Sequence, residues 1–179
     1  MTKYAALLRG IGPGNPNMRN EKLREVSEGL GLENVQTVIS SGNVVFEAES
    51  ANASDLETSL EDAWTRELGF ESTTLIRSQE ELEALIDLRP FGDREHGRES
   101  YLLVTFAKHP LSVDFDLPHQ PPDRDYWILD ATDRELFTVT DTTSIGTPDV
   151  MAWVENKFGK EITSRTWLTV HRILKRMGG

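Results

Sequence analysis

Hydrophobic and polar residues follow two periods along this chain, and the changes between them predict its elements. Alternation at every second residue predicts strands, whereas apolar residues at i, i+3 and i+7 predict helices. The unbroken apolar run from Ala5 to Leu8 predicts a central strand covered on both faces. The first elements expected are a strand over 4–9, a helix capped by Asn17 or Asn20 and closed by Gly31, a hairpin of 35–40 and 44–46, a helix opened by the Ser54 and Glu57 capping box and closed by Gly69, and a strand over 73–77.

This order of elements is that of a ferredoxin-like domain, strand-helix-strand-strand-helix-strand. The expected fold class is therefore α+β, with a ferredoxin-like (βαββαβ) N-terminal half over residues 1–77 and a second, smaller α+β half over residues 78–179. In such a sheet the third strand lies between the first two. The end of the first strand should then lie beside the turn that joins the second strand to the third.

The second half begins with another capping box, Ser78 with Glu81, at the start of a helix. No internal repeat is visible in the letters. The later elements expected are a loop or hinge over 92–100, a strand over 101–107, a proline- and aspartate-rich surface excursion over 108–125, a hairpin of 126–129 and 135–140, a helix capped by Thr147 and ended by Gly159, and a basic amphipathic helix over 164–177.

Composition removes several classes of function. The 179 residues are 37% hydrophobic, which is enough for a substantial core. The chain has no cysteine, which excludes disulfides, thiolate metal sites and cysteine nucleophiles and fits a reducing compartment. Its N-terminal apolar run is too short for a signal peptide or a membrane span. A cytoplasmic protein without a membrane partner is expected.

The net charge of -11 argues against nucleic-acid binding, which needs clustered lysine and arginine. The charge is uneven, because residues 1–24 and 157–179 are basic while the middle of the chain is strongly acidic. Intramolecular charge balance explains this distribution. The alternative is an anion site where the two basic ends meet, to which Arg165 would contribute.

Two glycine turns carry the sharpest functional hypothesis. The first follows the strand that ends at Arg9, and the second is Ser41-Gly42-Asn43. Glycine-loop amides, a helix N-terminus and a bidentate arginine together suit an anion. Turn formation alone, with Arg9 paired to a carboxylate, is the simpler alternative. The candidate ligand-binding residues are Arg9, Gly10, Gly12, Gly14, Ser41, Gly42, Asn43 and Arg165.

Cofactor and metal motifs are not recognisable. Asn15 occupies the position where a dinucleotide fingerprint requires its third glycine. The acidic residues and His119 of the 108–125 excursion could hold a divalent ion, but their pattern favours a solvated loop. No cofactor and no metal are expected. Whether the protein is an enzyme stays open, and a catalytic alternative has Arg9 and Asn43 polarising a substrate while an unidentified carboxylate acts as base.

Three stretches resemble the bacterial domain of unknown function 1697 family: YAALLRGI at 4–11, SSGNVVF at 40–46 and TSRTWLTVHRIL at 163–174. The resemblance extends over essentially the whole chain. The family's opening motif departs at Gly12, Pro13 and Asn15, and Thr166 stands where its terminal motif has asparagine. The resemblance implies an α+β fold with a ferredoxin-like first half, and it implies no activity.

The leading hypothesis is an uncharacterised cytoplasmic protein that binds a small anionic or phosphate-bearing ligand at the glycine-loop edge. The competing hypothesis is a structural or protein-interaction module without catalysis, which would hold a partner or a second copy through an exposed sheet edge or the basic ends. Self-association is compatible with both hypotheses, and nucleic acid is not an expected partner.

Overall fold

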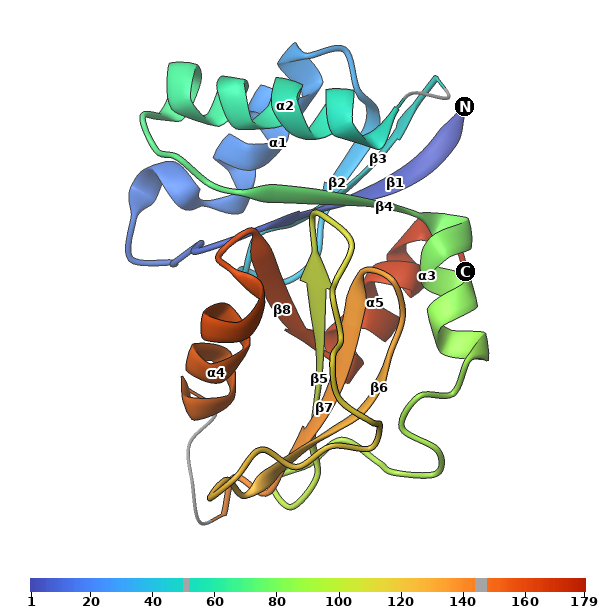
Figure 1. The fold of residues 1–179 in the computed structure, drawn as a ribbon. Helices are drawn as coiled ribbons and strands as arrows, with labels where there is room; N and C mark the ends of the chain where they lie inside the picture. The colour runs from blue at the N-terminus through green and yellow to red at the C-terminus, as the bar shows by residue number, and fades with distance from the viewer. Residues whose placement is uncertain (50–51, 144–147) are drawn as a thin grey trace. The chain divides into compact units, whose positions relative to one another are not determined.

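The computed structural model describes residues 1–49, 52–143 and 148–179 (Figure 1). Within these residues the fold combines two four-stranded antiparallel sheets with five α-helices, so the expected α+β class is confirmed. The expected cap at Thr147 lies outside the described residues. Two compact units are formed, residues 1–84 with 171–179 as the first and residues 85–170 as the second. A boundary between residues 77 and 78 stays a prediction.

The first sheet has the strand order β2-β3-β1-β4, and all of its neighbouring strands are antiparallel. The end of β1 therefore lies beside the turn between β2 and β3. The elements of this part are β1 (Thr2–Leu8), the 3-10 helix η1 (Pro16–Met18), α1 (Asn20–Gly29), β2 (Glu33–Thr37), β3 (Asn43–Ala48), α2 (Ala53–Ala63), the π-helical turn η2 (Trp64–Leu68), β4 (Thr74–Ser78) and α3 (Gln79–Asp87).

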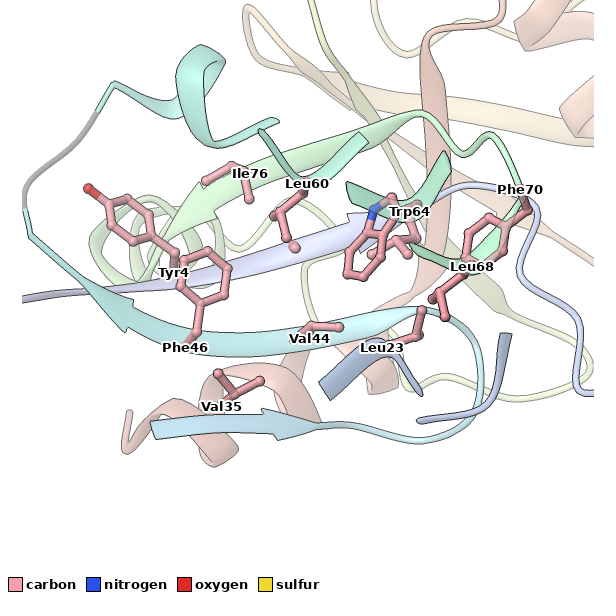
Figure 2. Packing of buried hydrophobic residues seen from close by; sticks show 12 residues of the cluster. Tyr4, Leu23, Val35, Val44, Phe46, Leu60, Trp64, Leu68, Phe70 and Ile76 are labelled. Atoms are coloured by element: carbon pink, nitrogen blue, oxygen red, sulfur yellow. The ribbon is translucent and has the colours of Figure 1, made fainter. Parts of the chain in front are cut away.

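One face of this sheet forms a core with α1 and α2 (Figure 2). Alternate residues of β1 point into it, and the Tyr4 ring lies 5.8 Å from the ring of its cross-strand partner Phe46. Leu23 of α1 and Leu60 of α2 close the cluster from the helix side. The buried Trp64 indole donates to Thr74 Oγ1 at 3.0 Å, so its one polar atom is satisfied inside the core.

Carboxylates cover the outer edge of β4, the last strand of the sheet. An open strand edge can pair with another chain, and proteins block such edges in several ways. Here every second amide of the strand donates to a glutamate: Thr74 to Glu61 at 2.8 Å, Ile76 to Glu57 at 3.0 Å and Ser78 to Glu81 at 2.8 Å. The outward-facing amides of β4 are therefore used within the chain.

The beginning of α2 differs from its expected form. Asn52 is the N-cap, and its side chain accepts from Ser54 N at 2.9 Å. Glu57 does not complete a capping box, because its carboxylate is drawn to Ile76 of β4. The expected box at α3 is confirmed, since Ser78 N donates to Glu81 and Glu81 N donates to Ser78 Oγ at 3.1 Å.

The second sheet repeats the topology of the first, with strand order β6-β7-β5-β8. A helix precedes the fourth strand in both units, while residues 108–125 take the place that α1 has in the first. Each fourth strand ends in arginine and a hydroxyl residue, Arg77-Ser78 and Arg165-Thr166. The elements from residue 101 onward are β5 (Tyr101–Ala107), β6 (Tyr126–Ala131), β7 (Glu135–Thr140), α4 (Pro148–Phe158), β8 (Ile162–Thr166) and α5 (Trp167–Met177).

The final helix begins at Trp167 instead of Ser164. Residues 162–166 pair with β5 as a strand, with Arg165 opposite Val104. Thr166 then caps the N-terminus of α5, since its Oγ1 accepts a hydrogen bond from Thr169 N at 3.2 Å. None of the helices in the described part of the chain has the length and apolar character needed to cross a membrane.

Candidate functional site

The two glycine turns meet at the end of β1. Leu8 N donates to Gly42 O at 2.9 Å, which joins the strand end to the second turn. Gly42 has φ +81°, and a Cβ built on it would lie 2.6 Å from Ile11 Cγ1. Only glycine fits this position without movement, because both the backbone conformation and the space exclude a side chain. The juxtaposition expected from the order of the elements is therefore present.

The N-terminus of α1 belongs to the same edge. Asn20 Nδ2 donates to Ile39 O at 2.9 Å and so ties the first turn of the helix to the loop before Gly42. The N-cap residue is Arg19, so the expected cap at Asn17 or Asn20 is wrong, and the Arg19 side chain makes no capping hydrogen bond. The first amides of a helix have no intrahelical acceptor. The helix therefore presents its positive end at this edge, with the Glu21 carboxylate as the acidic group of its first turn.

Arg9 is anchored through its backbone. Its amide donates to Thr73 O at 2.9 Å, and its carbonyl accepts from Ser72 Oγ at 2.7 Å. Its side chain is half-buried. These two bonds fix the point from which the guanidinium extends. Ser72 and Asn20 thus help to build the edge, although the only sequence signal for either was the capping preference of Asn20.

The three glycines of the first turn differ in what they require. Gly10 has φ +73°, a backbone conformation that favours glycine. Gly12 and Gly14 have no positive φ, and a Cβ on either would have no neighbouring atom within 4 Å. Gly10 is therefore needed for the backbone conformation of the turn. Gly12 and Gly14 are not, and the space beside their Cα atoms is open.

Asn43 braces the second turn from inside. It is fully buried, and its Nδ2 donates to Val38 O and to Ser41 Oγ, both at 3.0 Å. Val38 N donates back to Asn43 O at 3.0 Å. These bonds hold Ser41 and Gly42 in place, so the side-chain amide of Asn43 has a structural task in addition to any contact with a ligand.

Arg165 lies in the second unit, on β8, and is only 7% exposed. Its Nη1 donates to Thr163 Oγ1 at 2.7 Å and to Ser164 O at 2.8 Å. Burial lowers the pKa of Arg165 to about 10, because removal from water disfavours the charged form. The guanidinium therefore still carries its charge at neutral pH.

The acidic excursion over 108–125 is organised by ion pairing and aromatic packing. Asp114 lies 2.9 Å from Lys157 Nζ, and this hydrogen bond lowers the pKa of the Asp114 carboxyl. His119 stacks on Phe115 with the ring centroids 4.3 Å apart. No group of three or more potential metal-ligating side chains gathers anywhere in the described ranges 1–49, 52–143 and 148–179.

Comparison with known proteins places the chain among proteins without an assigned activity. A family model described as "Protein of unknown function (DUF1697)" matches residues 1–137. The fold is similar to that of a conserved bacterial protein from Streptococcus pneumoniae, with a TM-score of 0.70 and 23% sequence identity over 100% of this chain and 99% of that one. No curated protein matches the sequence.

Proposed function

This chain belongs to the DUF1697 family of proteins of unknown function, and from that premise we propose that it binds a small anionic or phosphate-bearing ligand. The proposed site is the glycine-loop edge, defined as residues 9–14, the N-terminus of α1 and residues 39–43. Since the family description assigns no activity, the proposal rests on the residues of this edge.

One observation carries the proposal, the hydrogen bond from Asn20 Nδ2 to Ile39 O at 2.9 Å. It holds the positive end of α1 against the loop that leads into Gly42, while the bond between Leu8 and Gly42 brings the Arg9 loop to the same place. Backbone amides at a helix N-terminus and in glycine turns favour an anion. An arginine beside them adds a donor suited to carboxylate or phosphate oxygens.

Each residue has a distinct role in this proposal. Arg9 pairs with the anion, Gly10 allows the backbone to approach it, and the Ser41 hydroxyl is a further donor. The buried Gly42 lets the second turn pack against Ile11. Asn43 keeps the second turn in shape. A contribution from Arg165 stays a separate prediction, since its Nη1 is already bonded to Thr163 and Ser164.

The proposal includes a ferredoxin-like arrangement of residues 1–77. The strand order β2-β3-β1-β4 supports it, together with the helices that follow β1 and β3. A cytoplasmic location is also proposed, and the absence of cysteine supports it.

The competing proposal is a structural or protein-interaction module without catalysis. It is favoured by the bonds within the second turn, where the Asn43 amide is already directed at Val38 and Ser41. In that case the glycines only allow the backbone to form the two turns, and no small anion stabilises the protein.

Thermal unfolding in the presence of nucleotides and sugar phosphates distinguishes the two proposals. A ligand that binds the folded state raises the melting temperature. We expect at least one compound to stabilise the wild type and to lose most of that effect in Arg9→Ala. Arg172→Ala is the matched control, since it removes one exposed arginine from outside the edge. An equal response of Arg9→Ala and Arg172→Ala, or no response of the wild type, would reject the anion site.

A further inference from the structure

We infer a second ligand site, in the second unit, that takes a small organic anion with an apolar body and a carboxylate or phosphate head group. The site is a hollow of about 270 Å³ between the segment that follows β5 and the turn that follows α4. All of its lining residues belong to the second unit, so it is independent of the proposed glycine-loop edge.

Backbone hydrogen bonds fix both walls of the hollow. On one side, Lys108 N donates to Glu161 O at 3.0 Å, and Leu111 N donates to Asp133 O at 2.7 Å. On the other side, Gly159 N donates to Glu155 O at 2.9 Å. Gly159 has φ +87°, so glycine suits the turn that takes the chain from α4 to β8. The hollow is therefore preformed by hydrogen bonds that do not involve a ligand.

The floor of the hollow is apolar. Ala107 and Ile162 are directly paired across β5 and β8, and both are buried in the core of the second unit. Leu111 and Phe158 pack against the same core from the two walls and remain partly exposed. Apolar surface that faces a hollow favours an apolar group in place of water.

The rim of the hollow carries charged groups of both signs and a hydroxyl. Lys160 and Ser112 are exposed, and neither side chain has a polar partner among the residues that the structure describes. His109 Nε2 lies 3.1 Å from Glu161 Oε2. Lys157 is held by Asp114 at 2.9 Å. The ammonium of Lys160 is therefore the charge available to a ligand, with the Ser112 hydroxyl as a second donor.

Floor and rim together define the chemical class of the ligand. The floor suits a small apolar body, and the Lys160 ammonium suits an anionic head. The volume lies just below the range of about 300 to 1,000 Å³ that holds drug-sized ligands, so the ligand is smaller than these. Phenyl phosphate and benzoate are suitable probes, since both join an aromatic ring to an anion and differ in the head group.

The test is an NMR titration of the 179-residue chain with phenyl phosphate, benzoate, inorganic phosphate and phenol. We expect saturable shifts of the amides of Ala107, Leu111 and Gly159 with phenyl phosphate or benzoate. The tighter of the two identifies the preferred head group. Binding of that probe should be at least about threefold tighter than binding of inorganic phosphate or phenol, because only the probe uses both floor and rim.

Variants then assign the rim. Lys160→Ala should weaken binding of the preferred probe by roughly threefold to tenfold, in line with an exposed charge-assisted contact. Lys175→Ala, which removes an exposed lysine elsewhere, should have no effect. Arg9→Ala should leave these shifts unchanged, which separates the hollow from the glycine-loop edge. The inference is overturned if no probe gives saturable shifts around Gly159, or if Lys160→Ala binds as tightly as Lys175→Ala.

Discussion

The Glu57 carboxylate accepts a hydrogen bond from the amide of Ile76 at 3.0 Å, and both residues are buried. This bond joins α2 to the outer edge of β4, where two further glutamates bind Thr74 and Ser78. The protein thus uses carboxylates in place of a fifth strand. Because these outward amides are already used, strand addition at β4, one route for the competing module hypothesis, is disfavoured.

Replacement of Glu57 should lower the stability of the fold. Glu57→Ala leaves the Ile76 amide without its acceptor, and we expect the free energy of unfolding to fall by about 1 to 3 kcal/mol. Glu57→Gln keeps an acceptor oxygen and should lose less. Asp62→Ala, at an exposed position of α2, is the matched control. Urea unfolding measures all three, and equal midpoints for Glu57→Ala and Asp62→Ala would contradict the role given to this bond.

Substitution of the two turn glycines should have very different effects. Gly42→Ala places a Cβ 2.6 Å from Ile11 Cγ1 at a φ of +81°, so we expect a loss of about 1 to 3 kcal/mol. Gly14→Ala meets no atom within 4 Å and should change stability by less than about 0.5 kcal/mol. Thermal or urea unfolding of the pair is the measurement. A Gly42→Ala protein as stable as Gly14→Ala would show that the two turns are not packed together.

Tyr126→Phe should leave the protein equally stable or make it more stable. The Tyr126 hydroxyl is buried, and it has no hydrogen-bond partner within the described residues. Removal of an unsatisfied polar group relieves its desolvation cost. Loss of more than about 1 kcal/mol in urea unfolding would instead indicate that the hydroxyl contributes a stabilising bond.

The same tyrosine makes the stability of the fold depend on pH in the alkaline range. Burial raises the pKa of Tyr126 above the ordinary value of 10.0, and the nearby Asp149 adds to this effect. The unfolded chain therefore ionises first as the pH rises, so the stability from this group is complete below pH 10 and declines above it. In Tyr126→Phe the decline of stability above pH 10 should be smaller than in the wild type. Identical alkaline profiles would contradict the raised pKa.

Asp114 makes the stability of the fold depend on pH in the acidic range, where its contribution is lost as the pH falls. Its hydrogen bond to Lys157 lowers the carboxyl pKa below 3.8. A lowered pKa favours the folded state above the pKa of the unfolded chain, and this contribution is lost as the pH falls through the folded pKa. NMR titration of the Asp114 carboxyl should show a midpoint below 3.8, moving upward in Lys157→Ala. A midpoint that is the same in both proteins would show that the pair does not form in solution.

The order of the elements was sufficient to predict that the two glycine turns lie side by side. A strand-helix-strand-strand connection places the end of β1 next to the turn before β3, and the bond between Leu8 and Gly42 confirms this proximity. The glycine spacing could not reveal the Asn20 bond to Ile39, because that contact depends on where a helix and a loop come together in space.

Other features could not be predicted because the local sequence pattern was compatible with two different structures. Ser54 and Glu57 match a capping box as well as Ser78 and Glu81 do, yet only the second pair forms one. Glu57 faces a strand edge whose amides need acceptors, and tertiary structure decides its partner. Arg165 likewise fits the basic face of a helix in the letters, whereas pairing with β5 makes it part of a strand. The repeated strand order of the two sheets has no counterpart in sequence similarity.

An NMR titration of the 179-residue chain with inorganic phosphate tests the proposed anion site at the glycine-loop edge. We expect saturable shifts of the amides of Gly10, Asn20 and Gly42. The affinity for phosphate should be at least about threefold weaker in Arg9→Ala and unchanged in Arg172→Ala. A wild-type protein in which these three amides do not respond, or an Arg9→Ala protein with wild-type affinity, would contradict the proposed anion site.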